Sequence, residues 1–189
     1  MVGINKKQII IAFFIVLILF IISITGAYYI KQNYNGSNTQ NITASFEDKK
    51  VIKLSNKLPI SDALGKQIEE SDDKQSYVVF TIKNESDSSA SYEVFLTKNE
   101  SKLPIKENYI KFYLTDENNE PLKGFDTSLI PSYNDLTYLS NKPASKLLYK
   151  GVISGNSSSK LKLRVWVADT YALSDTTETV SFDIDVREQ

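Results

Sequence analysis

The chain divides near residue 30 into an apolar run and a polar remainder in which apolar residues recur in alternation. Residues 9–30, IIIAFFIVLILFIISITGAYYI, contain no charged side chain. A helix of about 22 residues is about 33 Å long, which is enough to cross the hydrocarbon core of a bilayer. We therefore predict one transmembrane helix over residues 9–30.

The charges that flank this run set its expected orientation. Lys6 and Lys7 precede it without any acidic residue, and Lys31 is the only charge that follows before Glu47. The positive-inside rule then places residues 1–8 in the cytoplasm and the rest of the chain outside the cell. The expected location is the cell membrane, crossed once by a signal anchor.

A cleaved signal peptide is the alternative interpretation of the same run. Thr25-Gly26-Ala27 weakly matches a small-x-small cleavage site. The apolar stretch is nevertheless longer than the h-region of about 7–15 residues that is typical of signal peptides, which favours a retained anchor. Residues 31–44 are polar and show no hydrophobic period, so we expect a flexible stalk there.

Residues 45–189 show the short, alternating segments of an all-β domain. Turn-forming clusters rich in Asn, Asp, Ser and Gly separate these segments. This pattern predicts an Ig-like antiparallel β-sandwich as the ectodomain. The predicted strands are 51–54, 77–83, 91–98, 109–115, 147–154, 160–168 and 179–186.

Two segments, 77–83 and 61–70, allow more specific predictions. The segment 77–83 is apolar on both faces, which is typical of a central strand, and it leads into 91–98 through either a hairpin or a crossing between sheets. A short helix is expected over 61–70, with Ser61 as its N-cap and with Leu64 and Ile68 as its apolar positions.

Composition narrows the possible chemistry. The sequence has no cysteine and no histidine, so the domain lacks disulfides and also the commonest general base and metal ligand. Its net charge is −1 and its only arginines are Arg164 and Arg187, which does not suit nucleic-acid binding. We find no catalytic constellation, cofactor motif or metal site in the sequence, and we expect a protein that is not an enzyme.

Trp166 stands out as a candidate for partner binding. By alternation it lies on the same strand face as Lys160, Lys162 and Arg164, away from the aliphatic face. Trp166 and Arg164 would then anchor a partner. In the alternative interpretation, Trp166 lies beneath a loop near the end of its strand, such as residues 169–177.

Two further surfaces are candidates. Tyr109, Lys111 and Tyr113 share one face of their predicted strand and would present an aromatic stripe to a glycan or a peptide, unless a second sheet covers them. The basic face of 160–168 would form cross-strand ion pairs with Asp183 and Asp185 if the last two strands are neighbours.

Clusters of acidic and amide side chains are better explained as loops than as sites. Residues 116–120 offer oxygen ligands at alternate positions, but they lack the glycine and the distal glutamate of an EF-hand, so a hairpin loop is favoured. A run of acidic residues is interpreted as a solvated loop; it consists of Glu69, Glu70, Asp72 and Asp73.

Five N-x-Ser/Thr sequons are also present, and they would be glycan sites only in a eukaryotic source. They begin at Asn35, Asn41, Asn84, Asn99 and Asn156.

Several stretches together resemble a group of largely uncharacterised surface proteins of low-GC Gram-positive bacteria, which are N-terminally anchored and Ig-like. The matching segments are 58–62 (LPISD), 77–96 (YVVFTIKNESDSSASYEVFL), 109–114 (YIKFYL) and 148–171 (LYKGVISGNSSSKLKLRVWVADTY). More distantly the chain is similar to camelysin and the biofilm-fibre proteins, which pair an export segment with a β-sandwich. The resemblance implies an exported sandwich. It transfers no functional residue, because this chain has no histidine to hold a catalytic metal in the usual way.

The expected function is that of a single-pass, membrane-anchored extracellular module that binds a partner or serves a structural role. Its partners would be the lipid bilayer, through residues 9–30, and a protein or a glycan. The alternatives are a subunit of an extracellular fibre, released by cleavage near Ala27, or an accessory subunit of a membrane complex.

Overall fold

The computed structural model describes residues 41–55, 59–70, 76–99, 104–139, 142–172 and 175–189. The predicted cytoplasmic segment 1–8, the transmembrane helix 9–30 and residues 31–40 of the predicted stalk lie outside the described residues. Within the described part of the chain, no helix has both the length and the apolar character needed to cross a membrane.

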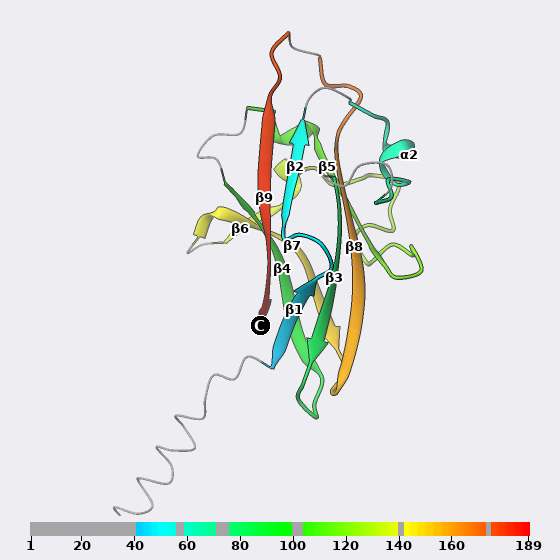
Figure 1. Ribbon diagram of the computed structural model, residues 1–189, viewed down its shortest axis with the longest axis vertical. Coiled ribbons are helices and arrows are strands. Elements are labelled where there is room, and N and C mark those ends of the chain that lie inside the picture. The colour runs from blue at the N-terminus through cyan, green and yellow to red at the C-terminus, as the bar shows by residue number, and fades with distance from the viewer. Residues whose placement is uncertain (1–40, 56–58, 71–75, 100–103, 140–141, 173–174) are drawn as a thin grey trace, which may run out of the picture. The chain divides into compact units, whose positions relative to one another are not determined.

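Two antiparallel sheets form the domain, which confirms the prediction of an all-β sandwich (Figure 1). The four-stranded sheet has the order β1 (Ile42–Phe46), β3 (Tyr77–Asn84), β8 (Ser157–Val167) and β5 (Ile110–Asp116). The five-stranded sheet has the order β2 (Val51–Ser55), β9 (Thr179–Glu188), β4 (Ala90–Lys98), β7 (Lys142–Ile153) and β6 (Thr137–Leu139). The described helices are α2 (Asp62–Gly65) and the 3₁₀ turns η1 (Glu107–Tyr109) and η2 (Tyr133–Asp135).

The core lies between the two sheets, where the alternating apolar residues of each strand face inward. Phe112 of β5 meets Phe182 of β9 edge-on, with ring centroids 6.0 Å apart, and Tyr133 of η2 contacts Phe182 at 4.9 Å. These rings join the sheets directly. The inward rows on β8 and β9 follow the predicted alternation, and their fully buried members are Leu161, Leu163, Val165, Val167, Val180, Phe182 and Ile184.

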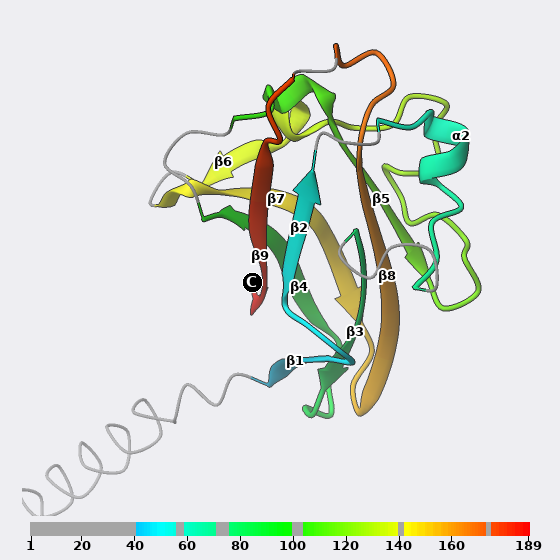
Figure 2. The same ribbon diagram turned by 45° about the horizontal axis from the view of Figure 1, so that its top comes forward.

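The domain begins earlier than the sequence pattern indicated. The predicted stalk ran to residue 44, but β1 starts at Ile42, whose side chain is only 2% exposed. A single buried isoleucine among polar residues gives too weak an alternation to reveal a strand. The chain then passes from β1 to β2 and so changes sheets within a few residues (Figure 2).

The sheet topology answers two questions that the sequence left open. β3 and β4 belong to different sheets, so the connection between them is a crossing and not a hairpin. β8 pairs with β3 and β5, while β9 pairs with β2 and β4, so the expected ion pairs between the polar faces of β8 and β9 do not form. Lys160 instead pairs with Glu47, and Asp185 with Lys50.

Asn84 fixes the turns at one end of the sandwich. Its side-chain amide donates hydrogen bonds to the carbonyls of Ser88, Ile153 and Ser154, and its carbonyl oxygen accepts from the backbone and hydroxyl of Ser86. The residue has no exposed surface. Although Asn84 begins a sequon, its amide is fully engaged within the fold, so it links the β3–β4 turn to the end of β7.

Lys146 is a buried cation in the five-stranded sheet. Its ammonium donates to Glu107 at 2.8 Å and to the carbonyl of Tyr133 at 2.7 Å, and it lies 4.4 Å and 4.2 Å from the ring centroids of Tyr133 and Tyr138. Only 1% of its surface is exposed. This ion pair joins β7 to both 3₁₀ turns, so it fastens the loops that close the other side of the core.

Replacing Asn84 with alanine is expected to destabilise the domain by about 2–4 kcal/mol, because the buried Ile153 carbonyl and the carbonyls of Ser88 and Ser154 lose their donor at once. Denaturant unfolding of the full-length protein, followed through the fluorescence of its single tryptophan, measures the loss. Asn108→Ala on the exposed surface of η1 is the control and should change the free energy of unfolding by less than about 0.5 kcal/mol. Equal effects of the two substitutions would contradict the role given to Asn84.

The start of η2 should contribute a pH-dependent term to stability. The Asp135 carboxylate accepts from the Ser132 hydroxyl at 2.7 Å and from the Ser132 backbone N–H at 2.8 Å, and these bonds lower its pKa below the usual 3.8. A lowered folded-state pKa contributes stability above the unfolded pKa that is lost as the pH falls through the folded value. Asp135→Asn should therefore be less stable than the native protein at pH 7, and the difference should shrink below pH 4 in parallel thermal melts. A constant difference across this range would argue against the assignment.

Candidate functional site

The outward face of the four-stranded sheet brings together most of the chemistry that the sequence singled out. The outward row on β8 consists of Lys160, Lys162, Arg164 and Trp166. In the register of the sheet, Arg164 lies between Tyr77 of β3 and Tyr113 of β5. Three of the four predicted partner-binding residues, Trp166, Arg164 and Tyr113, thus lie on this one face.

Residues 59–70, here named the cover segment, lie across the end of this face. Their backbone joins the sheet where Ile60 donates to the Val167 carbonyl at 2.9 Å and accepts from the Asp169 N–H at 3.0 Å. Ser61 caps α2 as predicted, because its hydroxyl accepts from the Leu64 N–H. Figures 1 and 2 both show α2 lying outside β8.

The helix itself is shorter than predicted. It ends at Gly65, so the four-residue spacing of Leu64 and Ile68 does not place both on one helical face. Leu64 is 58% exposed, whereas Ile68 is buried. The predicted helix over 61–70, with Leu64 and Ile68 as its apolar positions, is therefore wrong beyond Gly65.

Trp166 lies beneath α2. Its ring is 2% exposed and its indole N–H donates to an Asp62 carboxylate oxygen at 3.2 Å. A Cβ at Gly65 would overlap the ring, so the absence of a side chain allows α2 to approach this closely. Trp166 is covered near the end of its strand, as one interpretation expected, and the described residues that cover it belong to α2, whereas that interpretation suggested residues 169–177.

Arg164 is a buried cation that is held by neutral oxygen atoms. It donates to the Ile68 carbonyl at 2.8 Å, to the Thr115 hydroxyl at 3.0 Å and to the Asn119 side-chain oxygen at 2.8 Å. Its guanidinium carbon lies 5.3 Å from the centroid of the Tyr77 ring. The side chain connects the cover segment, β5 and the following turn.

Burial also shifts the pKa values of Arg164 and Tyr77. Desolvation lowers the pKa of the Arg164 guanidinium below its ordinary value, while neighbouring Tyr77, Tyr113 and Glu69 act in the opposite direction. Burial raises the pKa of the Tyr77 phenol, and the positive charge of Arg164 partly offsets this effect. At neutral pH the arginine is therefore charged and the tyrosine is neutral.

The two tyrosines of the predicted stripe lie in different surroundings. Tyr113 is 9% exposed, and the ammonium of Lys66 lies 5.3 Å from its ring centroid. Tyr109 belongs to η1 and is half-buried, with its ring edge-on to Tyr171 at 5.2 Å. The stripe is thus divided between the sheet face and the neighbouring loops, and partner binding through these tyrosines stays a prediction.

The turn after β5 forms the second border of the face. Asp116 accepts from the N–H groups of Asn118 and Glu120, and the chain returns beside β5 through a bridge between Thr115 and Pro121. Residues 116–120 are therefore a hairpin loop, as favoured from the sequence. Asn119 has a positive φ of 66°, which turns its side-chain oxygen toward the cations of β8.

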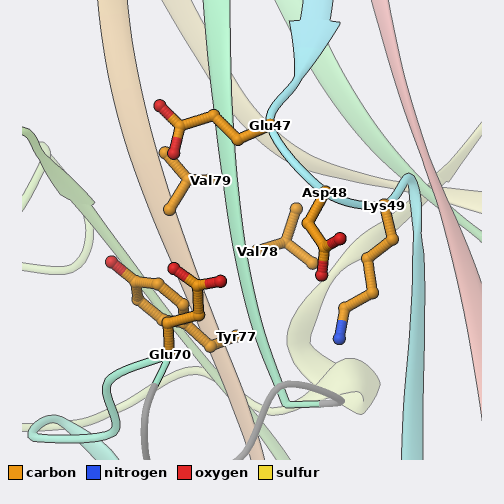
Figure 3. Close-up of a pocket in the computed structure, with 7 residues that line it drawn as sticks. All are labelled: Glu47, Asp48, Lys49, Glu70, Tyr77, Val78 and Val79. Atoms are coloured by element: carbon orange, nitrogen blue, oxygen red, sulfur yellow. The ribbon is translucent and has the colours of Figure 1, made fainter.

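A hollow of about 440 Å³ lies between these borders. Its cationic lining comes from β8, and its acidic lining comes from the segment after β1 and from the end of the cover segment. A smaller hollow of about 170 Å³ shares Glu47, Glu70 and Tyr77 with it. Figure 3 shows the Glu70 carboxylate beside the Tyr77 ring and the Glu47 side chain near Val79. The charged lining residues of the larger hollow are Glu47, Glu69, Glu70, Lys160, Lys162 and Arg164.

The sequence suggested only part of this site. It identified Arg164 and the basic row, but it gave no sign that Glu47, Tyr77 and Asn119 lie on the same face. Among the described residues, no cluster of three or more acidic side chains is placed to hold a metal ion. Asp72 and Asp73 of the acidic run lie outside the described residues.

Gly65→Ala is expected to destabilise the protein by about 1–3 kcal/mol, because the new methyl group overlaps the Trp166 ring. Higher helix propensity would return at most about 1 kcal/mol. Displacement of α2 should also shift the Trp166 emission toward the red, which a fluorescence spectrum measures. Ala63→Leu on the exposed side of the same helix should leave the emission unchanged. An unchanged spectrum for Gly65→Ala would show that α2 does not cover Trp166.

Comparisons with known proteins identify no relative from which function can be transferred. No protein-family model matches this chain, and no curated protein matches it. The functional interpretation therefore depends on the apolar run near the N-terminus and on the geometry of the sandwich.

Proposed function

We propose that this protein is a single-pass membrane protein whose extracellular Ig-like domain binds a partner or serves a structural role. The observation that carries the proposal is the apolar run 9–30, which precedes the β-sandwich in the sequence with only a short polar connection between them. The lysines at positions 6 and 7 favour a cytoplasmic N-terminus. The domain would then lie outside the cell, at the cell membrane.

The order of the four-stranded sheet supports the Ig-like classification. Its strands follow one another as first, second, fourth and third along the chain, which is the pattern of the A-B-E-D sheet of Ig domains. The five-stranded sheet differs from an Ig domain, because β9 lies between β2 and β4. The likeness is thus strongest in the sheet that carries the hollow.

A binding role is supported by the outward face of this same sheet. Side chains that are far apart in the sequence form a hollow of about 440 Å³ there, a size typical of small-ligand sites. A buried arginine, a half-buried tyrosine and several carboxylates line it. The proposed partners are the lipid bilayer, through residues 9–30, and a ligand on this face.

A released fibre subunit is the second candidate. β1 and β2, at the start of the domain, are each the edge strand of a different sheet. Edge strands provide backbone groups that can pair with another chain. Cleavage near Ala27 would free the domain for such assembly. An accessory role in a membrane complex, with the span as the contact, would instead show as a stoichiometric partner on purification in detergent.

The absence of native cysteine allows a direct test of the topology. Thr170→Cys, in an exposed loop of the domain, should react with a membrane-impermeant maleimide on intact cells. Asn5→Cys is the matched control and should react only after the cells are permeabilised.

Intact-mass measurement of the same membrane fraction distinguishes the anchor from the cleaved form. A retained anchor gives the full chain in the membrane, whereas loss of residues 1–27 and release into the medium supports the fibre subunit. Labelling of Asn5→Cys but not Thr170→Cys on intact cells would refute the proposed orientation.

A further inference from the structure

Two cations on the outward face of β8 share a single neutral oxygen atom. The Asn119 side-chain oxygen accepts from Lys162 at 3.1 Å and from the Arg164 guanidinium at 2.8 Å. The other described hydrogen bonds of these two groups end on the Glu117 carbonyl, the Ile68 carbonyl and the Thr115 hydroxyl, all of which are uncharged. Lys160, by contrast, forms an ion pair with Glu47.

This arrangement places like charges close together. Because both nitrogen atoms contact the same oxygen, they lie no more than about 6 Å apart, so the two positive charges repel each other. An oxyanion that contacts both groups would replace this repulsion with two charge-assisted hydrogen bonds. Lys162 and Arg164 both line the 440 Å³ hollow, although Arg164 itself is only 3% exposed.

The carboxylates that line the hollow disfavour a ligand that carries only negative groups. Glu69 and Glu70, at the end of the cover segment, bring negative charge to the same hollow, whereas the Glu47 carboxylate is paired with Lys160. A ligand with several negative groups would be repelled by these carboxylates. A ligand that also carries a positive group would be attracted to both sets of charges, and Tyr77 and Val79 of β3 add a less polar part to the lining.

We propose that the hollow binds a small zwitterion, with its oxyanion group held by Lys162 and Arg164 and its ammonium group facing Glu69 and Glu70. The inference rests on the proposed binding role, but it does not depend on the membrane anchor or on the orientation of the chain. It assigns the ligand class by charge and size, and the simplest chemical representatives are short peptides with free termini.

Isothermal titration calorimetry on the full-length protein in detergent micelles tests the proposal. The probes are glycylglycine, which carries both charges, acetate, which carries only the negative one, and methylammonium, which carries only the positive one. Glycylglycine is expected to bind about tenfold more tightly than either singly charged probe, because only it pairs with both sets of lining charges.

Each of two variants removes one charge, the first from the cations and the second from the carboxylates that line the hollow. Lys162→Gln should weaken glycylglycine binding about tenfold, and Glu70→Gln should weaken it by a similar factor. Glu70 is exposed, so its replacement leaves the fold intact and keeps the test valid if Lys162→Gln alters the turn. Lys53→Gln, an exposed position on β2 of the other sheet, is the matched control and should leave binding unchanged. Far-UV circular dichroism of each variant confirms that the sandwich is present.

The titrations distinguish a zwitterionic ligand from a simple anion. Equal binding of acetate and glycylglycine, with no effect of Glu70→Gln, would overturn the zwitterionic ligand. No binding of any probe up to millimolar concentration would overturn it as well, and so would equal losses in Lys162→Gln and Lys53→Gln. None of these outcomes alters the maleimide labelling, so failure of the ligand assignment and failure of the proposed topology can be told apart.

Discussion

The burial of the second half of β8 on both of its faces is the constraint on which the rest of the domain depends. Its inward row is aliphatic and packs into the core, as expected of a central strand. Its outward row is polar and aromatic, yet Arg164 and Trp166 are 3% and 2% exposed. With no disulfide to constrain the chain, both layers of contact must come from packing and hydrogen bonds alone.

Covering the outward row requires segments that are remote in the sequence. The cover segment brings Asp62 to the Trp166 indole and the Ile68 carbonyl to Arg164, while the turn after β5 brings Asn119. A buried guanidinium is costly unless its donors are satisfied, so these loops have fixed positions relative to the sheet. The hollow beside Arg164 is lined by residues of the cover segment, of the turn and of β8.

Lys146 is a second buried cation, and its charge is compensated differently from that of Arg164. Lys146 is satisfied by the Glu107 carboxylate, by a carbonyl and by two tyrosine rings, so its charge is neutralised within the fold. Arg164 and Lys162 contact uncharged oxygens instead. Lys146 and Arg164 both fasten loops, but only Lys146 is paired with a carboxylate, whereas the hydrogen bonds of Arg164 end on uncharged oxygens.

The alternation of apolar residues determined most of the strands, because each strand has one face in the core and its period of two is visible in the sequence. β8 and β9 were predicted almost to their ends for this reason. The same reasoning missed β1, where a single buried isoleucine gives no pattern, and β6, which has only three residues. β7 is longer than predicted, because its first residues lack apolar alternation.

The sequence by itself therefore determined the apolar run, the all-β class and the aliphatic face of each main strand. Only the tertiary structure decided which strands are neighbours, since strand order depends on contacts between distant residues that no local period records. That order separated β8 from β9 and placed Glu47, Tyr77 and Asn119 around Arg164. It also placed α2 over Trp166, because the close approach at Gly65 depends on where the cover segment crosses the sheet.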